Sequence, residues 1–189
     1  MQIRKTAAVA LVLLAVISCK RGEEKAAGFS KPGTPSEARG TSTTGTGNDV
    51  GAMMPEYAAM YLDGTKFDLA ARRHNVVLLN VWATWCGPCV YEIPELQQIH
   101  DHYAQRGFEV VGVSVDESGV ESVREFVAAQ KKMTYPIALD ADGKITNLLE
   151  TSVLPTSVLV DRSGKIVWKR YGAIMPGDEG LKKAIEAAL

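Results

Sequence analysis

The fold of this 189-residue chain is decided by one stretch, VVLLNVW at residues 76–82, which continues as Ala83-Thr84-Trp85-Cys86-Gly87-Pro88-Cys89. An apolar, β-branched run of this kind is typical of a central strand that is buried on both faces. After the cysteines, Ile93, Leu96, Ile99 and Tyr103 repeat every three to four residues, which predicts a helix that ends near Gly107. The stretch therefore predicts a buried strand that leads into a helix, with two cysteines at the junction.

Cys86 and Cys89 lie three residues apart at the predicted start of that helix. A helix N-terminus presents unpaired N–H groups and a partial positive charge, which favour a thiolate over a thiol. We therefore expect Cys86 to be an exposed nucleophile and Cys89 to close the disulfide that releases a substrate. The alternative is half a zinc site, but the sequence has no second cysteine pair and no suitably spaced histidine pair, so we expect no metal.

Strand and helix patterns alternate on both sides of this junction. Asp63-Gly64 is a two-residue hairpin signal between two short strand patterns. The alternation predicts an α/β fold, with a central mixed β-sheet and helices on both of its faces. Strands are expected at 57–62, 66–69, 109–115, 135–139, 157–160 and 165–171, and helices at 120–127, 145–149 and 181–188.

The first 18 residues are predicted to be a signal peptide. Arg4 and Lys5 precede an apolar run at 7–17, which as a helix would rise only about 16 Å and is too short for a permanent membrane span. The run ends in Val16-Ile17-Ser18-Cys19, which resembles a bacterial lipobox. We therefore expect a lipid on Cys19 and a membrane-anchored, extracytoplasmic (periplasmic) protein; the alternative is a general secretory signal with a chance cysteine.

Residues 19–52 are predicted to form the lipidated N-terminus and a flexible tether. Glycine, serine, threonine and proline dominate the segment, which cannot bury enough apolar surface to offset its ordering entropy. The folded domain is expected over 53–189. From Val50 onward the chain has 14 basic and 18 acidic side chains, a balance that gives no basic face for nucleic acid.

The run Trp82–Cys89, followed by Glu92-x-Pro94, resembles the active site of the thioredoxin superfamily, and within it the TlpA/ResA-like membrane-anchored oxidoreductases of bacteria. The resemblance covers about 55–189 and implies a thioredoxin-like fold with an N-terminal hairpin and an extra helix and strand within 115–139. Val153-Leu154-Pro155-Thr156 resembles the family's cis-proline loop. The resemblance implies that the residues in contact with substrate are Trp85, Gly87, Pro88, Leu154 and Pro155.

One position departs from the superfamily pattern. Cytosolic-type thioredoxins carry a buried aspartate six residues before the first cysteine, where this chain has Asn80, which cannot take a proton. Cys89 still needs a base because a thiolate is the attacking species. Glu92 is the candidate, since it lies three residues after Cys89 on the same helical face and the ResA-like branch has a glutamate there. The alternative is a solvated helix carboxylate, and in either case we expect an exposed side chain whose replacement by Gln changes stability little.

The resemblance implies an enzyme, a dithiol reductase that acts on protein disulfides outside the cytoplasm through its CGPC motif. Its family's substrates include apocytochrome c and metal-site assembly proteins, and a membrane thiol carrier supplies the electrons. We expect a monomer that needs no cofactor. Two alternatives for the same dithiol stay open: a thiol peroxidase, although the Pro-x-x-x-Thr-x-x-Cys motif is absent, and a Cu(I)-binding protein, because soft thiolates suit Cu(I).

Overall fold

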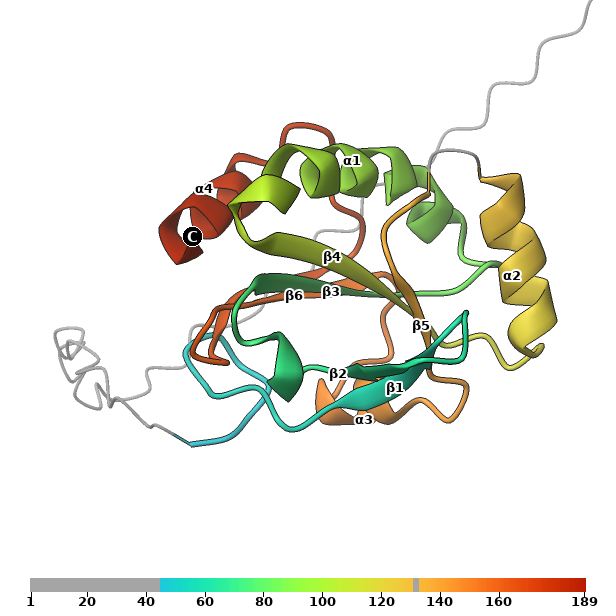
Figure 1. Ribbon diagram of the computed structural model, residues 1–189, viewed down its shortest axis with the longest axis horizontal. Helices are drawn as coiled ribbons and strands as arrows, with labels where there is room; N and C mark the ends of the chain where they lie inside the picture. The colour runs from blue at the N-terminus through green and yellow to red at the C-terminus, as the bar shows by residue number, and fades with distance from the viewer. Residues whose placement is uncertain (1–44, 131–132) are drawn as a thin grey trace, which may run out of the picture. The chain divides into compact units, whose positions relative to one another are not determined.

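The computed structural model describes residues 45–130 and 133–189 (Figure 1). The predicted signal peptide, Cys19 and the tether up to residue 44 lie outside the described residues. Within the described part of the chain, no helix is both long enough and apolar enough to cross a membrane. The α-helices of the described residues are α1 (Gly87–Tyr103), α2 (Val120–Ala129), α3 (Lys144–Leu148) and α4 (Glu179–Ala188).

Seven strands form one mixed sheet in the order β2-β1-β5-β4-β3-β6-β7. The central strand β3 pairs parallel with β4 and antiparallel with β6, and all seven of its residues are buried. The expected mixed α/β fold is therefore confirmed. The strands are β1 (Ala58–Tyr61), β2 (Lys66–Asp68), β3 (Val76–Trp82), β4 (Phe108–Ser114), β5 (Ile137–Leu139), β6 (Thr156–Val160) and β7 (Ile166–Tyr171).

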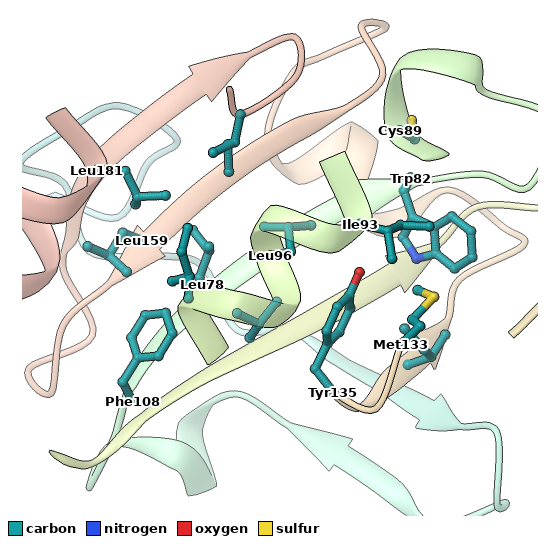
Figure 2. Close-up of a cluster of buried hydrophobic side chains, with 14 of the residues drawn as sticks. Leu78, Trp82, Cys89, Ile93, Leu96, Phe108, Met133, Tyr135, Leu159 and Leu181 are labelled. Carbon is teal, nitrogen blue, oxygen red and sulfur yellow. The ribbon is translucent and has the colours of Figure 1, made fainter. Parts of the chain in front are cut away.

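Alternate residues of β3 serve two separate hydrophobic clusters. Leu78 and Trp82 belong to the cluster on the face covered by α1, α2 and α4, part of which Figure 2 shows. Leu79 and Val81 belong to the opposite cluster, to which α3 contributes Ile145. Figure 1 shows α1 and α4 on one side of the sheet and α3 on the other. Burial on both faces explains why β3 is continuously apolar.

The expected N-terminal hairpin and the expected extra helix and strand are both present. β1 and β2 pair antiparallel around the turn at Asp63-Gly64, which is the expected N-terminal hairpin. α2 and β5 form the expected insertion, and β5 pairs parallel with β4 and antiparallel with β1. The insertion thus joins the hairpin to the central strands.

Residues 45–52, which we had assigned to the tether, are hydrogen-bonded to the folded body. Ile166 N donates to Ala52 O at 2.9 Å, and Gly51 N donates to Ile166 O at 2.8 Å. The Lys169 ammonium group also donates to Asn48 O at 2.9 Å. These backbone bonds occupy the free edge of β7, and composition alone does not reveal them because they form between segments far apart in the sequence.

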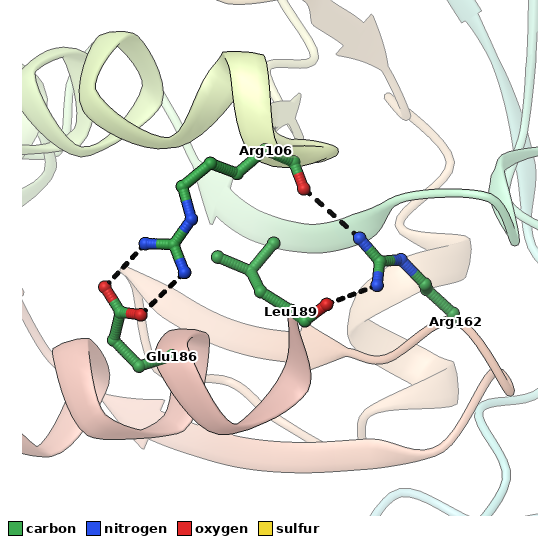
Figure 3. A network of polar contacts seen from close by, with 4 residues as sticks. All are labelled: Arg106, Arg162, Glu186 and Leu189. Atoms are coloured by element: carbon green, nitrogen blue, oxygen red, sulfur yellow. Dashed lines mark hydrogen bonds and ion pairs between the residues drawn. The ribbon is translucent and has the colours of Figure 1, made fainter.

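A polar network closes the end of the sheet where β3 begins (Figure 3). Both terminal nitrogens of Arg106 donate to the Glu186 carboxylate at 2.8 Å. Arg162 donates to the backbone carbonyls of His74, Arg106 and Leu189. The network therefore joins the short 3-10 turn after α1 (Ala104–Arg106), the β6–β7 turn and the end of α4.

Candidate active site

The two cysteines lie where β3 passes into α1. Cys86 is the N-cap residue of α1, and its sulfur accepts a hydrogen bond from Cys89 N at 3.3 Å. The two residues are joined by a disulfide. In this oxidised state Cys86 is 6% exposed and Cys89 is 1% exposed. We expected an exposed Cys86, but in the oxidised state only a small part of its surface is accessible, and Cys89 is more enclosed still.

Glu92 lies one turn further along α1 and is buried, with 1% of its surface exposed. Its two carboxylate oxygens have separate donors: Asn80 Nδ2 at 2.7 Å from Oε1, and Ile174 N at 2.6 Å from Oε2. Burial raises the pKa of Glu92 to about 7, against the lowering effects of these two bonds and of the charge of Arg170. The expectation of an exposed helix carboxylate was therefore wrong, because the segment that follows β7 covers this face of α1.

Asn80 connects the central strand to this carboxylate. Its side chain is 2% exposed, and its amide nitrogen donates to Ser157 Oγ at 3.0 Å as well as to Glu92. The position at which the resemblance led us to compare Asn80 with an aspartate of cytosolic-type thioredoxins thus holds the donor, and the carboxylate comes from α1. A titratable group is thus present at this position in the fold, three residues after Cys89 in α1, although it is supplied by a different element.

The segment between β7 and α4 is fixed to the site at three points. Gly172 N donates to Pro155 O at 2.8 Å, Ile174 N donates to Glu92, and Gly177 N donates to Glu95 Oε1 at 3.1 Å. Glu92 and Glu95 are three residues apart, so they lie on one face of α1. This segment therefore closes the site on the side away from β4.

The predicted substrate-contacting residues lie on two loops at one edge of the sheet. Trp85 is 72% exposed, and Gly87 and Pro88 are exposed beside it. The Leu154–Pro155 peptide is cis, as the resemblance implied. Pro155 directly precedes β6, and Thr156 pairs with Val81 near the end of β3. Because β3 and β6 are antiparallel, the start of β6 lies beside the end of β3, and the two groups of residues lie at the same end of the sheet.

Asp116, which the sequence did not single out, is a buried carboxylate that accepts hydrogen bonds from the turn before Cys86. Asp116 is 4% exposed and accepts from Thr84 N and from the Thr84 hydroxyl, the latter at 2.6 Å. Ser114 Oγ donates to the same carboxylate at 2.7 Å. The signal was present, because Thr84 and Asp116 each lie two residues beyond the end of neighbouring parallel strands, whose carboxyl ends meet at one edge.

Within residues 45–130 and 133–189, no group of three or more His, Cys, Asp or Glu side chains is placed to hold a metal ion. The three histidines include His100, whose Nδ1 accepts from Val110 N at 3.2 Å.

Comparisons with known proteins agree with this geometry. A profile of the Redoxin family matches residues 49–185. The chain is 34% identical over 123 residues to a thiol-disulfide oxidoreductase ResA of Bacillus cereus, and the match covers 65% of this chain and 70% of that protein.

Solved structures show the same likeness. A candidate thiol:disulfide interchange protein DsbE from Chlorobium tepidum superposes with a TM-score of 0.68 at 33% identity, covering 74% of this chain and 97% of the other. StoA from Bacillus subtilis superposes with a TM-score of 0.58 at 26% identity, covering 68% and 95%.

Proposed function

Because the chain belongs to the Redoxin family, and within the thioredoxin superfamily to the TlpA/ResA-like thiol-disulfide oxidoreductases, we propose that it reduces protein disulfides outside the cytoplasm. The observation that carries the proposal is the placement of the Cys86–Cys89 pair at the N-terminus of α1, with a buried carboxylate of raised pKa one turn below. Apocytochrome c and metal-site assembly proteins are the proposed substrates.

The reduced dithiol passes two electrons to the substrate in two exchange steps. The Cys86 thiolate attacks one sulfur of the substrate disulfide, so that a mixed disulfide forms and one substrate thiolate leaves. The Cys89 thiolate then attacks Cys86 Sγ, which forms the Cys86–Cys89 disulfide and releases the second substrate thiolate. A membrane thiol donor then supplies two electrons and two protons to restore the dithiol.

Glu92 takes the proton that Cys89 must lose before the second step. A base for this step should have a pKa close to the working pH, and burial places that of Glu92 at about 7. Asn80 and Ile174 N hold the two carboxylate oxygens, so the group is oriented before the reaction begins. Cys86 needs no such base, because the helix N-terminus favours its thiolate.

The substrate segment contacts Trp85, Gly87 and Pro88, which are exposed at the start of α1, and it runs along the loop of Leu154, which is half-buried, and Pro155, which is buried. The first loop presents a large apolar ring at 72% exposure, and such a surface is suited to an unfolded or extended polypeptide. An exposed apolar ring beside the dithiol therefore supports protein disulfides as the proposed substrates.

Cys19 carries the lipid that holds the head at the membrane, after removal of 1–18. The support is the lipobox-like Val16-Ile17-Ser18-Cys19 and the polar segment that follows it. In cell fractionation, Cys19→Ser should move the protein out of the membrane fraction while its head keeps full exchange activity. Unchanged membrane partitioning of Cys19→Ser would contradict the lipid anchor.

Trapping tests the proposed function itself. Cys89→Ser should accumulate mixed disulfides through Cys86 in cell extracts, identified by mass spectrometry after non-reducing separation. The matched variant Cys86→Ser should trap nothing and should lose reduction of insulin disulfides. Trapping by Cys86→Ser through Cys89, in place of trapping by Cys89→Ser, would reverse the two roles, and trapping by neither variant would contradict the exchange reaction.

A further inference from the structure

The turn that carries the nucleophile is held by a side-chain contact from the neighbouring strand. Both oxygens of Asp116 lie within 3.1 Å of Thr84 N, and Oδ1 also accepts from the Thr84 hydroxyl at 2.6 Å. Asp116 is 4% exposed, so these bonds are shielded from water. Charge-assisted hydrogen bonds of this length are about twice as strong as neutral ones.

Asp116 is itself held by hydrogen bonds with Ser114, the last residue of β4. Ser114 Oγ donates to Asp116 Oδ2 at 2.7 Å and accepts from Asp116 N at 3.3 Å. Val115 N donates to Trp82 O at 3.0 Å, so the chain beyond β4 stays beside the chain beyond β3. The carboxylate is thus a rigid acceptor at the first residues of the inserted segment.

Cys86 lies two residues after Thr84, so a restraint on Thr84 also restrains the position of the Cys86 sulfur. Cys86 N donates to Ala83 O at 3.1 Å, which closes the turn on either side of Thr84. The helix N-terminus stabilises a thiolate only within its first turn, so Cys86 must keep its N-cap position to remain reactive. A displacement of about 1 Å at a reacting group can cost a large factor in rate.

We propose that Asp116 and Thr84 are positioning residues for the Cys86 thiolate, through the hydrogen bonds that hold the turn at residues 83–86. The proposal rests on the proposed function only in taking Cys86 as the attacking thiol. Under this proposal, the start of the inserted segment at Asp116 positions the reactive cysteine, in addition to the pairing of β5 with β4 and β1.

The alternative is that Asp116 only stabilises the fold, and the chain offers a matched control. Asp140 is 5% exposed, follows the parallel strand β5 and accepts from Ile145 N at 2.6 Å. It restrains α3, on the face opposite α1. For Thr84 the control is Thr146, whose hydroxyl donates to Gly143 O at 2.8 Å in the same helix α3.

The test measures the rate at which Cys86 reacts with 5,5′-dithiobis(2-nitrobenzoate), followed by mass spectrometry on the peptide that contains Cys86. All variants are made in the reduced full chain with Cys89→Ser, at a temperature where near-ultraviolet circular dichroism shows every variant folded. Thr84→Val keeps the volume and the backbone N–H and should slow the reaction about fivefold, which corresponds to about 1 kcal/mol. Thr84→Ser should react at a rate within about twofold of the rate with Thr84, because serine keeps the hydroxyl that donates to Asp116.

Asp116→Asn should also change the rate, and its combination with Thr84→Val should change it by less than the sum of the two single effects, because both variants act on the bond between the Thr84 hydroxyl and the Asp116 carboxylate. Asp140→Asn and Thr146→Val should lower the melting temperature while leaving the rate unchanged. A wild-type rate for Thr84→Val, failed rescue by Thr84→Ser, or additive effects would each overturn the proposal. The probe needs no protein substrate, so a wild-type chain that fails to reduce insulin would contradict the proposed function without affecting this result.

Discussion

The carboxylates at the two ends of the sheet differ in exposure and in the direction in which their pKa is shifted. Where β3 begins, Arg106 and Glu186 form a two-bond ion pair with each side chain about half exposed. Where β3 ends, Glu92 is 1% exposed, and among the described residues it forms no salt bridge. The first carboxylate has a pKa lowered by its bonds to Arg106, and the second has a pKa raised to about 7 by burial.

The difference fits the proposed division between an end of the sheet that stabilises the fold and an end that carries the chemistry. An exposed ion pair stays charged at all moderate pH values and is screened by salt. A buried carboxyl with neutral donors resists ionisation and lowers the stability of the protein near neutral pH. A buried carboxyl with a pKa near neutrality, three residues after Cys89, is what the proposed proton acceptor requires.

The largest effect on stability should come from Glu92. Its folded pKa of about 7 exceeds the usual 4.5, so between these values the native state binds more protons than the unfolded state. The free energy of unfolding of the oxidised protein should therefore fall as pH rises from about 4.5 through 7, by on the order of 3 kcal/mol. In Glu92→Gln, urea unfolding across pH 4–8 should lack this fall, and an unchanged pH dependence would show that Glu92 ionises freely.

Asn80→Ala should have the next largest effect. It removes the donor to Glu92 Oε1, so the pKa of Glu92 should rise further and the fall in stability should move to higher pH. At pH 8 the variant should be less stable than wild type by about 1–3 kcal/mol, because a buried acceptor loses its partner. Ser157→Ala is the matched control, since it removes the other acceptor of Asn80 and should leave the pH at which stability falls unchanged.

The opposite end should give the smallest effect. Arg106→Gln removes the exposed pair with Glu186 and should shift the melting temperature by no more than about 2 °C, an effect that 0.5 M salt should erase. Disulfide exchange should keep its wild-type rate and pH profile. A loss of exchange activity in Arg106→Gln would show that the two ends of the sheet are coupled and would contradict their separate roles.

Much of this arrangement could be predicted from the sequence. The apolar run of β3, the period of α1 and the Asp63-Gly64 turn are local patterns, and each formed the expected element. The cysteine pair at the helix start follows from the same patterns, because the junction of strand and helix fixes where the residues lie.

What the sequence did not predict depends on segments that are distant along the chain. Spacing placed Glu92 on the same face as Cys89, but only the fold shows that Ile174, 82 residues later, covers it. Thr84 and Asp116 are 32 residues apart and meet because β3 and β4 are parallel neighbours. Burial, and with it the pKa of Glu92, is therefore a tertiary property.

The central claim is that Glu92 accepts the proton of Cys89, and the resolution step tests it most directly. Wild type and Glu92→Gln are compared by stopped-flow reduction of a fluorescent disulfide peptide between pH 5 and about 9, with formation and resolution of the mixed disulfide followed separately. Formation should be nearly unchanged. Resolution in wild type should rise through an inflection near pH 7, which Glu92→Gln should lack while resolving about a hundredfold more slowly, as loss of a general base predicts. Superimposable resolution profiles would contradict the claim and leave Glu92 as a buried structural carboxylate.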